Sequence, residues 1–163
     1  MNSRQTSNIG RAAGFSLIEL MVVVLIASIL IVTAASMYQT SVRKSRRTDA
    51  RNALLDLAGR EERYLSLNNT YTNVPANLGY GAVAIPFAVG NNANYYQISA
   101  IVITAPTLVG GVATPATFTI TAVPIGTQVN DTPCASFTVT STGSQSALNS
   151  GGADNTAACW QGG

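Results

Sequence analysis

The chain has 163 residues, of which 10% are charged and 47% are hydrophobic. Because soluble domains usually carry about 25% charged residues, part of this chain is expected to lie away from water. The length suits one modest globular domain with an additional element. Every lysine and arginine precedes Tyr64, so the C-terminal part has almost no field with which to attract a polyanion.

The N-terminal stretch combines a short polar leader with an apolar segment. Residues 1–14 contain Arg4 and Arg11 and no acid, and no charged residue occurs from Leu20 to Val42. A helix of about 20 apolar residues is long enough to cross a bilayer. We therefore expect residues 1–14 to be a leader and residues 15–42 to form a transmembrane helix.

The helical pattern continues beyond the apolar segment. Apolar residues recur at the spacing of one helix face as far as Leu65, no proline occurs before Pro75, and Asn68-Asn69 is a suitable stop. The sequence therefore predicts one continuous helix from Phe15 to about Leu67, roughly 80 Å long at 1.5 Å per residue. A domain of this size cannot bury such a helix, so lipid or partner helices must cover its N-terminal half.

The rest of the chain predicts a globular head over residues 43–163, with an amphipathic helix over 43–67 and an irregular connector over 70–94. Three later runs have strand-like composition or strict alternation of apolar and polar residues: Tyr95–Thr104, Thr117–Val123 and Ala135–Thr140. Glycines between these runs suit antiparallel hairpins. We expect an antiparallel sheet within residues 95–163, a tail with little structure of its own, and an α+β fold overall.

Two cysteines, Cys134 and Cys159, lie near the C-terminus. With no histidine and no third cysteine, the sequence offers no set of zinc ligands. In an exported domain the two would form one disulfide, and closing a loop of that size contributes roughly 3–4 kcal/mol. In a cytosolic protein they would instead remain reduced and buried.

The most informative motif is the stretch Gly14-Phe15-Ser16-Leu17-Ile18-Glu19-Leu20-Met21. A carboxylate inside an apolar segment costs about 2.5–3.5 kcal/mol at the bilayer centre and needs a partner. Cleavage after Gly14 would supply the α-amino group of Phe15, and such an ion pair is worth ~4 kcal/mol at about 4 Å before desolvation. Between chains, Glu19 could fix the axial offset of one helix against the next.

This stretch resembles the class III signal of type IV prepilins, in which a basic leader ends in glycine and the new N-terminus is aromatic with a glutamate as its fifth residue. Further along, three stretches resemble the PilE/ComP group of minor pilins: Arg60–Thr72, Thr117–Pro124 and Cys134–Trp160. Many pilins carry a glycine and a proline where this chain has Ser28 and Ser36, so no proline interrupts the helix there.

The resemblance implies the type IV pilin fold, with a C-terminal disulfide loop closed by Cys134 and Cys159. It implies that prepilin peptidase cuts between Gly14 and Phe15, that the Phe15 amine is methylated, and that Glu19 neutralises the N-terminus of a neighbouring subunit. No cofactor and no metal site are implied.

The partners and location follow from the same resemblance. We expect other pilin subunits, prepilin peptidase and the inner-membrane pilus assembly machinery as partners. The subunit would lie in the inner membrane, with its head in the periplasm, and then in the extracellular pilus. Its expected function is that of a structural subunit, a minor pilin, which supports pilus assembly, adhesion or twitching motility.

Other interpretations of the N-terminus remain. An ordinary secretory signal could be cleaved near Thr33-Ala34-Ala35, but Glu19 inside its apolar core argues against it. A plain signal anchor leaves Gly14-Phe15 and Glu19 unexplained. The basic residues of Arg43–Arg51 outnumber those of the leader, so the positive-inside rule would keep the head in the cytoplasm. This rule weakens for large translocated domains.

Two alternative functions also remain: a DNA-binding minor pilin for natural transformation, and a pseudopilin of type II secretion. Phosphate contacts come mainly from lysine and arginine, and the head beyond Leu65 has neither, so nucleic acid is not expected as a partner. Any DNA surface would need residues of Arg43–Arg63, part of which packs beneath the sheet.

The basic run Arg43–Arg51 is expected to be a solvated or inter-subunit helix face. Four interleaved acids would pair with it along the helix: Asp49, Asp56, Glu61 and Glu62. Trp160 is expected to pack on the disulfide. Enzymatic function is not expected, because the sequence lacks histidine, a phosphate-binding loop and carboxylates clustered outside the helix.

Overall fold

The computed structural model of the chain describes residues 15–82, 84–90 and 95–161, apart from the side chains of residues 36 and 109. The chain divides into two compact units, Met1–Gln39 and Thr40–Gly163. The predicted leader, including Gly14, lies outside the described residues.

The long helix predicted from the sequence is confirmed. Helix α1 runs over Leu17–Asn68, 52 residues without interruption. Its first turn is capped by Ser16, whose hydroxyl accepts the backbone N–H of Glu19 at 3.2 Å. Its end coincides with the predicted stop, because Asn69 adopts a left-handed conformation with φ 55°, which is typical of the residue that follows a helix.

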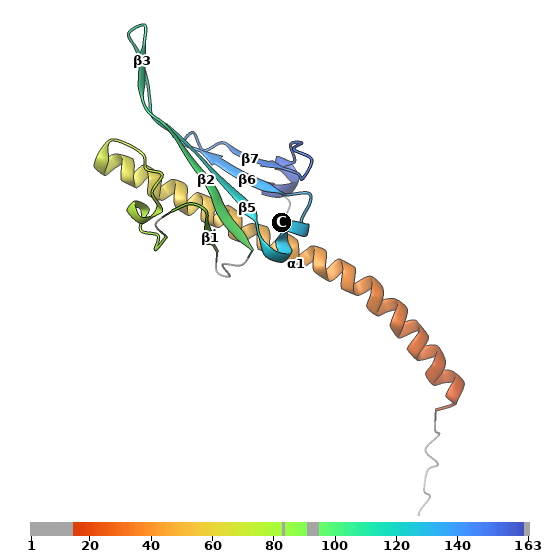
Figure 1. Ribbon diagram of the computed structural model, residues 1–163. Coiled ribbons are helices and arrows are strands. Elements are labelled where there is room, and N and C mark those ends of the chain that lie inside the picture. The colour runs from red at the N-terminus through yellow and green to blue at the C-terminus, as the bar shows by residue number, and fades with distance from the viewer. Residues whose placement is uncertain (1–14, 83, 91–94, 162–163) are drawn as a thin grey trace, which may run out of the picture. The chain divides into compact units, whose positions relative to one another are not determined.

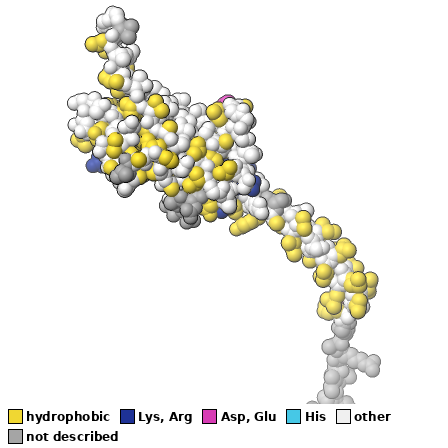
Figure 2. Space-filling model, viewed as in Figure 1, with side chains coloured by type: hydrophobic (Ala, Val, Ile, Leu, Met, Phe, Trp, Pro, Cys, Tyr) yellow, Lys and Arg dark blue, Asp and Glu magenta, His cyan; other side chains and the backbone are white. Residues whose placement is uncertain are grey.

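In the first unit, every described side chain is exposed to solvent. Leu17, Leu25 and Val32, for example, are 77%, 61% and 72% exposed. Figure 2 shows hydrophobic side chains along this whole segment of the helix. Among the described residues, α1 is the one helix long and apolar enough to cross a membrane.

The second unit combines the C-terminal half of α1 with an antiparallel sheet (Figure 1). The main sheet has five strands in the order β1-β2-β5-β6-β7, and β3 and β4 form a separate two-stranded hairpin that extends from the β2–β5 connection. The strands are β1 (Phe87–Val89), β2 (Tyr96–Thr104), β3 (Thr107–Val109), β4 (Val112–Thr114), β5 (Thr117–Pro124), β6 (Ser136–Thr140) and β7 (Gln145–Leu148). Three short helices complete the unit: η1 (Pro75–Leu78), η2 (Gly126–Asn130) and η3 (Ala157–Gln161).

The core lies between one face of α1 and one face of the sheet. Ala50, Leu54 and Leu57 recur every three or four residues, which places them on one side of the helix, and each is fully buried. They share a single hydrophobic cluster with the inward residues of the central strands, namely Tyr96, Ile98, Phe118, Ile120, Ala122, Phe137 and Val139. The alternation that predicted β5 and β6 thus separates buried from partly exposed positions.

Strand β2 departs from simple alternation. Its register with β5 shifts between Ile98 and Ala100, so Ser99 is an extra residue, a β-bulge. Before the bulge Tyr96 and Ile98 are buried, and after it Ile101 is buried. The extra residue changes the phase of the strand, because side chains alternate between faces with a period of two.

The structure differs from the sequence-based expectation in two segments. The connector expected to be irregular contains η1 and strand β1, which pairs with β2 at the edge of the sheet. The tail expected to have little structure contains β7, which pairs with β6, and the π-helical turn η3. Both strands are too short for an alternating pattern to be recognised, so their partners in the sheet define them.

Candidate functional site

The assembly residues predicted from the sequence lie at the start of α1. The Phe15 side chain is 77% exposed, and Glu19 is the acid in the first helical turn. Gly14 lies outside the described residues. The structure therefore places Glu19 near the positive end of the helix dipole, where a carboxylate is favoured.

Sequence reasoning missed the role of Ser16. Its hydroxyl accepts the N–H of Glu19, and a serine three residues before a glutamate is the signature of a capping box. The spacing of Ser16 and Glu19 is the signal in the sequence that predicts this cap. Glu19 thus occupies the third position of the helix. The cap formed by Ser16 stabilises the first helical turn within a single subunit.

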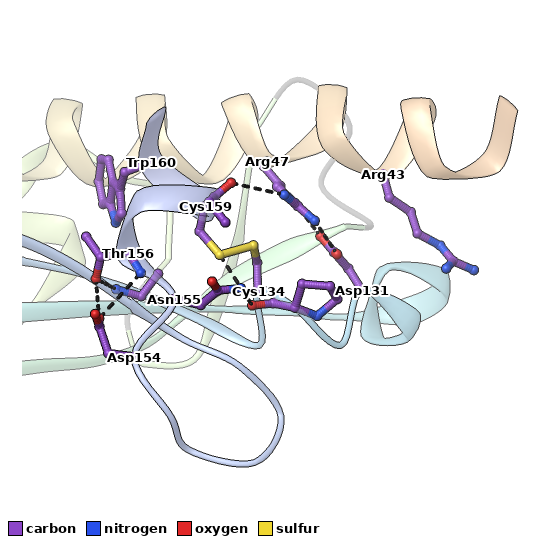
Figure 3. Close-up of a disulfide and its surroundings, with 12 residues drawn as sticks. Arg43, Arg47, Asp131, Cys134, Asp154, Asn155, Thr156, Cys159 and Trp160 are labelled. Carbon is purple, nitrogen blue, oxygen red and sulfur yellow. Dashed lines mark hydrogen bonds and ion pairs between the residues drawn. A yellow bond between two sulfur atoms is a disulfide. The ribbon is translucent and has the colours of Figure 1, made fainter. Parts of the chain in front are cut away.

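The C-terminal disulfide loop is present (Figure 3). Cys134 and Cys159 are bonded across 25 positions, and both are fully buried. The bond attaches η3 to the segment that precedes β6. Trp160 packs edge-on against Phe137, with ring centroids 6.0 Å apart, and its indole N–H donates to the carbonyl of Ser146 at 2.9 Å.

A buried ion pair joins α1 to the segment before the disulfide. Arg47 donates through Nε and Nη2 to the two carboxylate oxygens of Asp131, at 2.8 and 2.7 Å. The hydrogen bonds to Asp131 raise the pKa of Arg47. Gln128 also donates to Asp131, at 3.1 Å, and to the hydroxyl of Tyr96 at the same distance. Burial raises the pKa of that tyrosine to about 12.

Arg51 is also used inside the head. It donates through Nη1 to the carbonyl of Trp160 at 2.7 Å and through Nη2 to the Thr48 hydroxyl at 3.1 Å. Together with Arg47, which reaches the carbonyl of Ala158 at 3.4 Å, it holds the turn η3 against the helix. These two arginines are therefore structural.

The expected pairing along the helix is largely wrong. Among the described residues, the ion pairs are Arg47–Asp131, which crosses to another segment, and Arg60–Asp56, which is the one pair along the helix. Asp56 also accepts a hydrogen bond from the hydroxyl of Tyr80 at 2.6 Å. That hydrogen bond, followed by the hydrogen bond and the charge of Arg60, lowers the pKa of Asp56. Glu61, expected on the charged face, is fully buried.

The cations that face solvent form two groups on α1. The first, the basal cluster, comprises Arg43, Lys44 and Arg46. In this cluster Arg43 reaches the carbonyl of Asn130 at 3.2 Å, and the Arg46 guanidinium lies over the ring of Tyr95, 3.6 Å from its centroid. Lys44 is exposed.

The second group lines a groove of about 310 Å³ at the C-terminal end of α1. This terminal groove is formed by Arg60, Arg63, Tyr64, Leu67, Asn77, Leu78 and Gly79. Arg60 is held in place by Asp56 and by the carbonyl of Leu78 at 2.9 Å. Arg63 is exposed. The described lining contains an amide, an aromatic side chain and two guanidinium groups, and no carboxylate.

No cluster of three or more potential metal ligands occurs among the described residues. The head offers a cationic groove, a basal cationic cluster and a C-terminal loop that is held by the disulfide and two arginines.

Comparisons with known protein families divide the chain into two parts. The model described as "Prokaryotic N-terminal methylation motif" matches residues 9–35. The model described as "Type IV minor pilin ComP, DNA uptake sequence receptor" matches residues 36–138, which is more than half of the chain. No curated protein matches the sequence.

The second description bears on one expectation from the sequence. Nucleic acid was not expected as a partner, because the head beyond Leu65 has no lysine or arginine. A match to a family described as a DNA uptake sequence receptor does not support that expectation. It also favours the alternative of DNA reception over adhesion or motility.

Proposed function

The chain belongs to the ComP family of type IV minor pilins, and on this premise we propose that it enters a pilus through its N-terminal helix and receives DNA on its head. As a type IV pilin it is anchored in the inner membrane before assembly, and its partners include other pilins and the pilus machinery. Pilin families are structural rather than enzymatic.

The observation that carries the assembly proposal is that every described side chain of the first unit is exposed, although most of them are apolar. Exposed apolar area costs about 25 cal/mol per Å² in water. Lipid removes this cost before assembly, and the helices of neighbouring subunits remove it in a filament. Repeating one such heterologous contact produces a helical fibre rather than a closed ring.

In this proposal, prepilin peptidase cleaves between Gly14 and Phe15, and the amine of Phe15 is methylated. Glu19 then pairs with the N-terminus of a neighbouring subunit as the helix leaves the lipid. Support comes from the match to the methylation motif over residues 9–35. Mass spectrometry of the mature N-terminus is the direct measurement, and a protein that begins at Met1 in cells that make pili would contradict it.

The role of the Glu19 carboxylate is tested separately from the helix cap formed by Ser16. Glu19→Ala should still be cleaved and folded but should be lost from sheared pili, measured by quantitative mass spectrometry. Ser16→Ala is the matched control, because it removes the hydroxyl that caps the helix and leaves the carboxylate in place. Ser16→Ala should still enter pili, and normal incorporation of Glu19→Ala would contradict the role of the carboxylate.

For DNA we propose the terminal groove as the contact surface. The basal cluster comes directly after residues 15–42, the part of the helix that packs on other subunits in this proposal, so neighbouring subunits should cover it in a filament. The terminal groove lies at the other end of α1 and combines the side chains of Arg63, Tyr64 and Asn77. On duplex DNA, arginine and the tyrosine hydroxyl contact phosphate, while amides contact base edges.

The binding expected from so few cations is weak and only moderately dependent on salt. Two arginines that neutralise about two phosphates give a slope of roughly −1.8 in log affinity against log salt. The experiment is a salt titration of duplex DNA binding by the full chain in detergent micelles. Arg63→Gln should weaken binding and reduce the slope by about 0.9.

Lys44→Gln is the matched control, since it removes one exposed cation from the basal cluster. It should leave both the affinity and the salt slope nearly unchanged. The opposite result, with Lys44 required and Arg63 dispensable, would place the DNA contact on the basal cluster. Equal affinity for all three proteins would exclude Arg63 and Lys44 as contacts and would overturn the proposed role of Arg63.

A further inference from the structure

Glu61 is a buried acid that neither assembly nor DNA contact requires. It lies in the C-terminal half of α1 and is fully buried. One carboxylate oxygen, Oε2, accepts the backbone N–H of Thr72 at 3.1 Å. The other, Oε1, is also buried and has no hydrogen-bond partner among the described residues.

The bond from Thr72 continues into the wall of the terminal groove. The Thr72 hydroxyl accepts the N–H of Val74 at 3.2 Å and the side-chain amide of Asn77 at 3.1 Å. Asn77 belongs to η1 and lines the groove. Glu61 is therefore linked through Thr72 to a residue on which the shape of the groove depends.

The groups that face Glu61 do not compensate its charge. On α1 the adjacent Glu62 adds a like charge. On the connector, the hydroxyl of Tyr71 donates to Glu62 at 2.9 Å, and its ring packs edge-on against Phe118 of β5 with centroids 4.9 Å apart. Neither ion pair of the described residues includes Glu61.

Burial is accordingly the largest effect on this carboxyl. It raises the pKa of Glu61 to about 7 from an ordinary value of 4.5, and the repulsion of Glu62 acts in the same direction. The hydrogen bond from Thr72 opposes the shift but does not outweigh it. The protonated form is thus the one that the closed structure accommodates best.

We propose that Glu61 is a proton-sensitive latch, which when protonated holds residues 69–79 against α1 and when ionised favours their release. Local release returns the carboxylate to water without breaking the sheet, because this segment contains one short helical turn and no strand, and its cost is the exposure of the buried Tyr71, Pro75 and Leu78. Since Asn77 moves with the segment, release would also remove one wall of the terminal groove.

The pH range follows from linkage. The open form binds the proton less tightly than the closed form, so opening increases as the pH rises from about 4.5 to about 7 and then levels off. Across this range the opening equilibrium should increase by up to about 300-fold. A consequence for DNA, tighter binding at pH 5.5 than at pH 8, rests on the proposed function.

The direct test measures amide hydrogen exchange at Thr72 by NMR in the full chain in micelles, expressed as a protection factor so that intrinsic exchange is removed. In the unmodified protein this factor should fall between pH 5 and 7. Glu61→Gln keeps the shape and the acceptor but cannot ionise, so its protection should stay constant. Glu62→Gln is the matched control and should retain the dependence on pH.

A constant protection factor in the unmodified protein would overturn the latch, and so would the same pH dependence in Glu61→Gln. DNA affinity is then compared at pH 5.5 and pH 8 at fixed salt. Coupling requires that the difference seen in the unmodified protein disappears in Glu61→Gln, and an unchanged difference would exclude it. Absence of DNA binding at both pH values would reject the proposed function, while the exchange at Thr72 would still decide the latch.

Discussion

Arg47 and Asp131, 84 positions apart in the sequence, form a buried ion pair with two parallel hydrogen bonds. Both side chains are almost inaccessible to solvent, at 7% and 3% exposure. The pair fixes the segment before the disulfide on α1. Because each buried charge is compensated by the other, the stability of the head should depend strongly on whether both are present.

Removal of one partner should be severe. Asp131→Ala leaves the Arg47 guanidinium buried without its counter-charge, and a buried pair broken in this way typically costs about 3–5 kcal/mol. The double variant Arg47→Met with Asp131→Leu should lose less, because apolar replacement of both partners removes the desolvation cost as well. Urea unfolding of the three proteins measures this, and a double variant as unstable as Asp131→Ala would contradict it.

Reduction of the disulfide should destabilise the head by a comparable amount. Cys134 and Cys159 close a loop of 25 positions, for which chain entropy predicts about 3.5 kcal/mol. The loss should be smaller if the bonds of Arg47 and Arg51 to η3 persist in the reduced protein. Unfolding of the double variant Cys134→Ser with Cys159→Ser gives the value, and an unchanged midpoint would show that the two arginines suffice.

Tyr80→Phe should shift the titration of Asp56. The hydroxyl of Tyr80 donates to Asp56 at 2.6 Å and is the largest cause of the lowered pKa of that carboxyl. A lowered pKa in the folded state stabilises the protein above the ordinary pKa of the acid, and this contribution is lost as the pH falls through the lowered value. In Tyr80→Phe the pKa of Asp56 should rise towards its ordinary value, measured by NMR titration.

Deletion of Ser99 should remove the bulge in β2 without turning the core residues of the strand outward. Ser99 is the extra residue of the bulge, so its removal leaves Ile98 and Ile101 two positions apart, which keeps both on the face that packs on the core. Ser99→Ala keeps the bulge and loses only a hydrogen bond of 3.3 Å to the carbonyl of Thr121. The unfolding midpoints of the deletion and the substitution should therefore be similar. A loss in the deletion as large as the about 1.5–3 kcal/mol of an exposed isoleucine would contradict this.

The features that the sequence predicted are those that depend on neighbours along the chain. Helix α1, its end at Asn68-Asn69 and the alternating strands β5 and β6 follow from local periodicity and turn-forming residues. The N-terminal motif is similarly local, since Gly14, Phe15 and Glu19 lie within six positions. Local patterns of this kind are visible without knowledge of the path of the chain.

The tertiary structure decided the rest, because burial depends on which distant segments meet. Nothing near Arg47 in the sequence indicates that its partner is Asp131, and helical spacing suggested other acids. Glu61 looks like a surface residue until the connector covers it, and β1 becomes a strand only by pairing with β2. Burial disfavours the charged form of a side chain, and an opposite charge or hydrogen bonds compensate this cost. Packing therefore decides the role of each arginine and glutamate on α1.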